Sequence, residues 1–156
     1  MSVTVRLEGF KDLEKELERL ANPNQRKASA RRALRVSAQP IVDAAQAKAP
    51  RGDTNTLAPS IKFGTRLSKR QAGLHRRMFR NDRAAVEAFI GAGPFSSAHT
   101  QEFGTRHHAA QPFLRPAWDG GQREMLDRLK VELFADIQRT VARAERRAAR
   151  LAARAG

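Results

Sequence analysis

Apolar and polar residues alternate at residues 3–7 and 60–67, and the mostly apolar residues 85–91 are predicted to form a third strand segment. A period of two residues is typical of a strand with one buried and one exposed face. The second and third segments flank residues 68–83, which carry many arginines and lysines and a single acid. We expect these two strands to pair antiparallel, with the basic residues forming a long exposed loop at the tip of a hairpin.

Three other segments place apolar residues at steps of three and four, which is the period of an amphipathic helix. They are residues 11–20, 25–49 and 121–153. Pro40 lies inside the second segment and predicts a kink or a split there, because proline has no N–H to donate. Residues 97–102 predict one further helical turn. The apolar stripe of the last helix is predicted to consist of Leu126, Leu129, Leu133, Ile137, Val141, Ala144, Ala148 and Leu151.

These elements together predict an α+β fold in a single domain at residues 1–156. A small antiparallel sheet with a long β-hairpin would pack against two long helices, and a long C-terminal helix would follow. Two basic extensions are expected, the hairpin loop at residues 68–83 and a helical tail at residues 139–156. Apolar residues make up 40% of the chain, but aromatic residues only 6%, and alanine supplies much of the rest. The core should therefore be thin and completed by neighbouring subunits.

The chain contains no cysteine, which excludes disulfides and thiolate metal sites. Its first residues lack the basic-then-apolar order of a signal peptide, and no apolar run approaches the roughly 20 residues that cross a bilayer. We expect no membrane partner, and a protein that is made and used in the cytoplasm or in a particle assembled there.

Thirty lysines and arginines against sixteen acids give the chain a net charge of +14 at pH 7. Such a charge favours contact with nucleic acid, an anionic membrane surface or an acidic protein, and arginine suits bidentate contacts with phosphate or carboxylate. A merely solvated basic surface is the simpler alternative. The candidates for contact with DNA or a protein partner are Arg70, Arg76, Arg77, Arg80, Arg143, Arg146, Arg147 and Arg150.

No group of residues predicts catalysis, a cofactor or a metal ion. Ser97, His99 and Glu102 resemble a nucleophile, a base and an acid, but they lie in one short segment without a glycine-rich elbow. The adjacent His107 and His108 have no acidic neighbours, and a catalytic zinc ion needs three well-placed ligands. The aspartates are too scattered to predict a magnesium site. The chain is therefore predicted not to be an enzyme.

Residues 101–118 predict the most specified local structure of the chain. They contain two of the eight phenylalanines, two of the seven prolines and the only tryptophan. Glu102 should be partly buried here, and a buried acid usually has a partner. Two interpretations stay open: it pairs with an arginine across a subunit boundary, or it accepts backbone N–H groups in its own turn. The candidate structural and subunit-interface residues are Glu102, Phe103, Gly104, Thr105, Pro112, Phe113, Leu114, Arg115, Pro116 and Trp118.

Three short motifs follow one another along the chain. Residues 54–61 read Thr-Asn-Thr-Leu-Ala-Pro-Ser-Ile, residues 102–105 read Glu-Phe-Gly-Thr, and residues 112–117 read Pro-Phe-Leu-Arg-Pro-Ala. In these motifs the chain resembles the small neck or tail-completion proteins of long-tailed phages, also called minor tail components or gene-product-ten-like proteins. Asn55 occupies a position that is usually glycine in that family, and asparagine also tolerates a left-handed backbone.

The resemblance implies an α+β subunit of a ring, commonly sixfold, at the head–tail junction of the virion. Such a ring would lie between the portal and connector proteins and the tail terminator or tail tube, and it would leave a channel for double-stranded DNA. Phe103, Phe113, Leu114 and Trp118 would be rigid anchors, and contacts would run head-to-tail around the ring. The alternative is a free-standing protein that binds double-stranded DNA without sequence preference.

Overall fold

The computed structural model describes residues 15, 18, 20, 22–80, 86–93 and 95–155. The predicted strand at residues 3–7 and most of the predicted helix at residues 11–20 lie outside this part of the chain.

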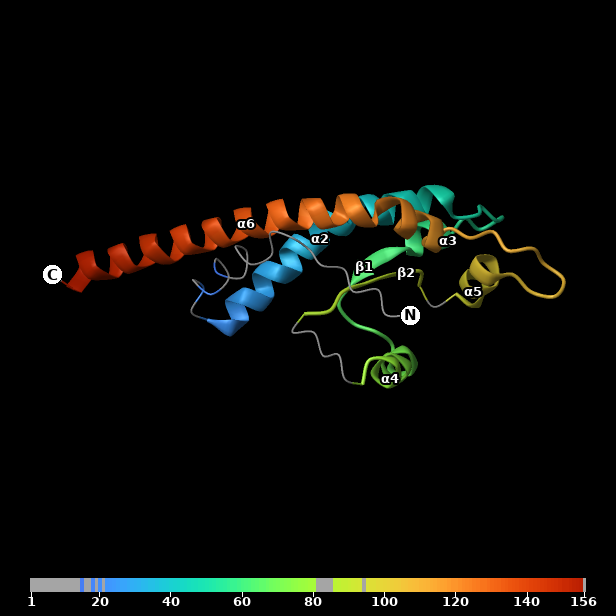
Figure 1. Cartoon of the computed structure of the whole chain (residues 1–156), viewed down its shortest axis with the longest axis horizontal. Coiled ribbons are helices and arrows are strands. Elements are labelled where there is room, and N and C mark those ends of the chain that lie inside the picture. The colour runs from blue at the N-terminus through green and yellow to red at the C-terminus, as the bar shows by residue number, and fades with distance from the viewer. Residues whose placement is uncertain are drawn as a thin grey trace.

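Two long helices, α2 (Pro23–Lys48) and α6 (Leu114–Ala155), form the frame of the molecule. Figure 1 shows α6 along most of the length of the molecule, with α2 beside it and the smaller elements to one side. Those smaller elements are α3 (Leu57–Ser60), β1 (Lys62–Gly64), α4 (Lys69–Met78), β2 (Phe89–Gly91) and α5 (Ser96–Phe103). The predicted α+β fold, with a small antiparallel sheet and a long C-terminal helix, is confirmed.

α2 confirms the second predicted helix. The side chain of Asn22 accepts a hydrogen bond from the backbone N–H of Asn24 at 2.9 Å and caps the helix. Pro23 occupies the first helical position, where its missing N–H costs nothing. The helix continues through Pro40, so the predicted split is wrong. Figure 1 shows α2 changing direction along its length, which fits the alternative prediction of a kink.

The two strands pair antiparallel as predicted, with Phe63 opposite Ile90, but each has only three residues. The prediction of a loop at residues 68–83 is wrong in its first part, because α4 forms there. Ser68 Oγ accepts the N–H of Gln71 at 3.3 Å, and Gln71 Oε1 accepts the N–H of Ser68 at 3.2 Å. This reciprocal capping box satisfies two backbone donors at the helix start.

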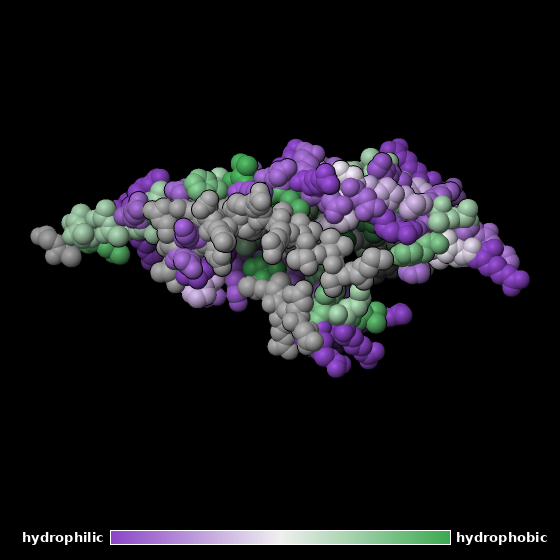
Figure 2. All heavy atoms as spheres, in the orientation of Figure 1, coloured by the Kyte–Doolittle hydropathy of each residue, from purple (hydrophilic) through white to green (hydrophobic). Residues whose placement is uncertain are grey.

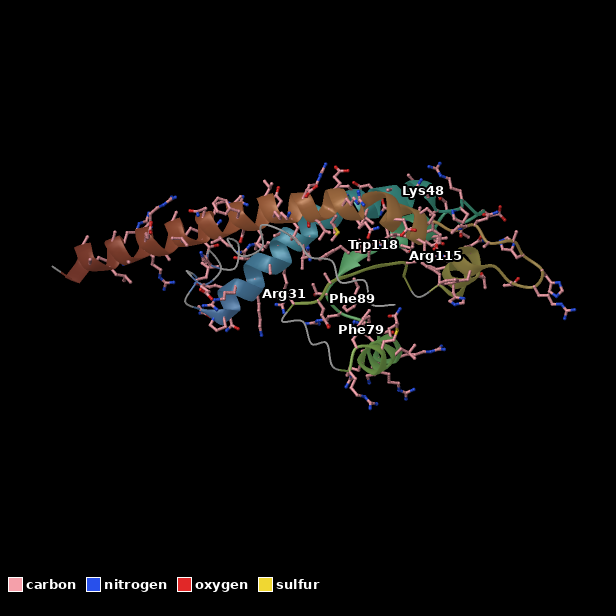
Figure 3. The ribbon with its side chains drawn as sticks, in the orientation of Figure 1. Arg31, Lys48, Phe79, Phe89, Arg115 and Trp118 are labelled. Atoms are coloured by element: carbon pink, nitrogen blue, oxygen red, sulfur yellow. The ribbon has the colours of Figure 1, made fainter. Side chains whose placement is uncertain are left out.

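α4 contains no buried residue, and Figure 1 shows it away from the two long helices. It is tied to β2 through aromatic rings. His75 lies 4.7 Å from Phe79 and 5.3 Å from Phe89, measured between ring centroids. Figure 3 shows the two phenylalanines near each other. In the described part of the predicted basic loop, residues 68–80, no residue is buried, and most of these residues form a helix.

α6 has 42 residues, which at about 1.5 Å per residue is about 60 Å. It begins at Leu114, earlier than the predicted start at residue 121, and runs through Gly120 and Gly121. A Cβ atom on Gly121 would lie 2.8 Å from Cγ1 of Ile41. The absence of a side chain therefore lets α2 and α6 approach each other closely.

Among the described residues, the buried apolar side chains form two small clusters near the contact between α2 and α6. The first contains Ile41, Val42, Ala45, Ala49, Ile61, Phe113 and Ala117, and the second contains Leu20, Ala33, Leu133 and Ile137. Alanine supplies three of the seven members of the first cluster and one of the four members of the second, and Phe113 is the one aromatic member, so this core is thin, as the composition predicts. Figure 2 shows hydrophilic side chains over much of the visible surface, interrupted by small apolar patches.

Candidate subunit and partner interface

Glu102 joins the end of α5 to the start of α6. Its side chain is buried, and Oε2 accepts the backbone N–H groups of Phe113 and Leu114 at 2.8 and 2.9 Å. Oε1 accepts the backbone N–H of Arg115 at 3.0 Å and its Nε at 3.1 Å. The first N–H groups of a helix have no partner within the helix. The carboxylate of Glu102 therefore caps α6 from a distant position in the sequence.

The turn after α5 makes this capping geometry attainable. Gly104 has a φ of +75°, in the left-handed region that favours glycine. A Cβ at this position would lie 2.9 Å from the backbone nitrogen of Ala110, so the returning chain leaves no space for a side chain. Thr105 N–H donates to the carbonyl of His108 at 2.8 Å, and Gln111 N–H donates to the carbonyl of Gln101 at 2.7 Å. These bonds bring residues 111–115 back to the end of α5.

The electrostatics of Glu102 favour its ionised form. Burial alone would raise the pKa of the carboxyl, but the three backbone N–H groups and the Arg115 side chain outweigh burial, and its pKa is lowered. The dipole of α6 and these hydrogen bonds both favour a negative charge on Glu102 at the start of the helix.

Of the two interpretations of Glu102, the capping interpretation holds in a modified form. The N–H groups come from the start of α6 instead of its own turn. An arginine does contact it, but this arginine is Arg115 of the same chain. Arg115 also donates from Nη2 to the carbonyl of Glu102 at 2.9 Å, and its guanidinium lies 4.8 Å from the ring centroid of Phe103.

The aromatic residues of the motif divide into buried and exposed members. Phe113 is completely buried, as expected for an anchor, and Leu114 is partly buried. Phe103 and Trp118 are 57% and 45% exposed, so neither ring is buried within the subunit as Phe113 is. Their expected role at a subunit interface stays a prediction. Figure 3 shows Arg115 and Trp118 close together on the first turns of α6.

The remaining motif residues, Thr105, Pro112 and Pro116, are exposed. Thr105 Oγ1 accepts the N–H of His107 at 3.3 Å within the turn. In the motif at residues 54–61, Asn55 has a φ of +43°. It therefore takes the left-handed conformation that was expected at this position, where glycine is usual in the family that the motif resembles.

A second ion pair, which the sequence did not predict, links the two long helices. Arg32 Nε lies 3.0 Å from Oδ1 of Asp136, and Nη2 lies 2.7 Å from Oδ2. Burial alone would raise the pKa of Asp136, but hydrogen bonds from Arg32 and Ser29 and the charges of Arg32 and Arg139 lower it. The two partners are 104 positions apart, so no local pattern indicates their contact.

The candidate arginines form two groups that the structure does not bring together. One group lies on and just after α4, and the other lies on the second half of α6; Figure 1 shows these elements well apart. All eight side chains are exposed. The first group is Arg70, Arg76, Arg77 and Arg80, and the second is Arg143, Arg146, Arg147 and Arg150.

Other kinds of site have little support in the described part of the chain. No group of three or more potential metal-ligating side chains occurs among the described residues. Within the same residues, no helix combines the length and the apolar character needed to cross a membrane.

Comparison with known families decides the class of protein. The family described as "Bacteriophage HK97-gp10, putative tail-component" matches residues 11–104, more than half of the chain. The chain belongs to the HK97-gp10-like family. The resemblance to neck and tail proteins of tailed phages is thus confirmed at the level of the family. This is a family of structural tail components, not of enzymes, and its members are expected in the virion. No curated protein and no solved structure shows a significant match to the chain.

The match to the HK97-gp10-like family ends at Gly104, within the segment that Glu102 organises. α6 and the motif at residues 112–117 lie beyond it. The carboxylate of Glu102 therefore connects the matched part of the chain to the long helix that follows.

Proposed function

We propose that this protein forms a ring at the head–tail junction of a long-tailed phage, joins the connector to the tail tube and leaves a channel for DNA. Membership of the HK97-gp10-like family supports a structural role in the tail. A sixfold ring, with portal-side and tail-side neighbours, is the arrangement that the resemblance implies.

The exposed rings at the start of α6 carry this proposal. Phe103 ends α5, beside the start of α6, and Trp118 lies on the first turns of α6. Glu102, Gly104 and Phe113 hold this helix start in place. Large apolar side chains gain no stability from exposure to water, and aromatic residues are enriched at protein interfaces. A rigid support with exposed aromatic side chains suits a contact between neighbouring subunits.

Substitution of these rings tests the proposal. In native mass spectrometry the wild-type protein should form a closed oligomer, alone or with its connector or tail neighbours. The double variant Phe103→Ala/Trp118→Ala should keep its melting temperature within about 3 °C, because both rings are exposed, but lose the oligomer. Phe134→Ala, which removes another half-exposed ring of α6, is the matched control and should retain the oligomer.

The position in the particle needs a second experiment. Phage lacking this protein should accumulate separate heads and tails in electron micrographs, and plasmid-borne wild-type protein should restore joined particles. Normally joined particles in the absence of the protein would rule out the proposed junction role.

A second candidate function, non-specific binding of double-stranded DNA by the free protein, is favoured by one observation. Arg143, Arg146, Arg147 and Arg150 surround a single hollow of about 360 Å³ on the last part of α6. Clustered guanidinium groups suit phosphate contacts, whose affinity falls steeply with salt. Tight, salt-sensitive binding of duplex DNA by the isolated protein, without any oligomer, would favour this function over the ring.

A further inference from the structure

The apolar stripe of α6 extends beyond the part that α2 covers. Leu133 and Ile137 of this stripe are buried in the second core cluster. Val141, the next member, is partly buried against the same cluster. The members beyond it, Ala144, Ala148 and Leu151, are exposed, and Leu151 has 59% of its surface accessible. The stripe therefore continues after its intramolecular partner has ended.

A hollow of about 450 Å³ lies between this exposed part of the stripe and the first turns of α2. Its apolar lining comes from Ala28 of α2 and from Ala144, Ala148 and Leu151 of α6. We call it the α2–α6 groove. The small alanine side chains leave the space between the two helices unfilled. Figure 2 shows apolar and hydrophilic side chains side by side on the projecting end of α6.

Arginines that form no ion pair with a described acid lie at the same groove. Arg143 and Arg147 both line it, and no ion pair joins either of them to an acid among the described residues. Arg32 lines the groove as well, but it already holds Asp136 through two hydrogen bonds. That pair shows how an arginine at this helix contact binds a carboxylate in the bidentate manner that guanidinium geometry favours.

We propose that the α2–α6 groove binds an acidic amphipathic segment of a neighbouring protein. Apolar side chains of that segment fill the space over Ala144 and Ala148, and its carboxylates pair with Arg143 and Arg147. This inference names the class of protein that the groove would bind. It rests on the proposed junction role only where it places that protein next to the ring in the particle.

Charge and chemistry favour this occupant over two others. DNA would use the arginines but gain nothing from the apolar lining between them. A second copy of the chain would bring another net charge of +14 to a cationic groove. An acidic segment with an apolar face complements both properties of the groove.

The test uses the full-length protein and a fluorescent synthetic helical peptide with leucines on one face and glutamates on the other. We expect saturable binding by fluorescence anisotropy. A peptide of the same composition, scrambled so that its apolar face is lost, should bind at least about tenfold more weakly. A short DNA duplex is the third probe.

Two charge-reversed variants of the same helix provide the decisive comparison. Arg143→Glu/Arg147→Glu should weaken binding of the amphipathic peptide at least about tenfold. Arg146→Glu/Arg150→Glu makes the same change in net charge, but these two residues do not line the groove. Its affinity for the peptide should stay within about threefold of wild type.

Several results would overturn the proposal. They are no binding of the amphipathic peptide, equal binding of the scrambled peptide, or equal losses in the two variants. Tighter binding of duplex DNA than of the peptide would assign the arginines to phosphate instead. None of these measurements requires a ring or a particle, so a negative result leaves the proposed junction role to its own tests.

Discussion

The two ends of α6 use arginine in opposite ways. At the first end, Arg115 contacts the side chain and the carbonyl of Glu102 and covers the ring of Phe103. At the other end, Arg143 and Arg147 have no carboxylate among the described residues. Arg115 therefore makes contacts within the fold, whereas Arg143 and Arg147 contribute little to the fold and are available to a partner.

This difference predicts where the stability of the subunit resides. Around Glu102 a buried acid satisfies several donors at once, so its loss leaves those donors unpaired. Arg143 itself is exposed, and removing its side chain should change little in the isolated subunit. The predictions below follow from this contrast.

Glu102→Ala should have the largest effect. We expect it to lower the free energy of unfolding by about 2–4 kcal/mol, because it removes the cap of α6 and leaves buried N–H groups without an acceptor. Urea unfolding followed by circular dichroism measures this change. Glu145→Ala, at an exposed acid in the second half of α6, is the control and should change the stability by less than about 0.5 kcal/mol. A loss below about 1 kcal/mol in Glu102→Ala would contradict the capping role.

Acid should weaken two separate contacts of α6, that of Glu102 at its start and that of Asp136 with Arg32 of α2. Both carboxyls have a pKa below the ordinary values of 4.5 and 3.8, so in acid the unfolded chain binds more protons than the folded chain. Their stabilising contribution is complete above those ordinary values and is lost as the pH falls through the lowered pKa values. Urea midpoints measured from about pH 7 to pH 3 should fall in the wild type and fall less steeply in Glu102→Gln. Identical slopes in the two proteins would exclude Glu102 as a source of the acid sensitivity.

Two adjacent glycines of α6 should respond in opposite directions. Gly121→Ala places a Cβ 2.8 Å from Cγ1 of buried Ile41 and should cost about 1–2 kcal/mol. Gly120→Ala meets no atom within 4 Å and should gain about 0.5–1 kcal/mol from better helix propensity. Thermal unfolding of the two variants gives the comparison. The close approach of α2 and α6 would be refuted if both substitutions were stabilising.

The sequence predicted those parts of the fold that depend on neighbouring residues. Periodicity located α2, most of α6 and the paired strands, and the asparagine at position 55 was correctly expected to take a left-handed backbone. The sequence does not predict α4, because a run of arginines with one acid favours an exposed loop. The spacing of Ser68 and Gln71 was the signal that could have identified its start.

The remaining features depend on contacts between distant segments. Acceptance of the α6 N–H groups by Glu102 needs the turn at Gly104 to return the chain, and no periodic pattern describes that path. Sequence alone also does not say which of several aromatic rings is buried within the subunit. Phe113 is buried, whereas Phe103 and Trp118 are exposed.

Removal of residues 143–156 should have the smallest effect on stability. No described residue from Arg143 onward is buried, and the last core member on α6 is Ile137, with Val141 packed beside it. We therefore expect the shortened protein to melt within about 2 °C of the full chain, whereas a cut before Leu133 should abolish cooperative unfolding. The shortened protein should nevertheless fail to support joined particles in a complementation assay. A drop of the melting temperature by more than about 5 °C would show that the C-terminal end of α6 belongs to the folding unit, and the contrast between the two ends of the helix would not hold.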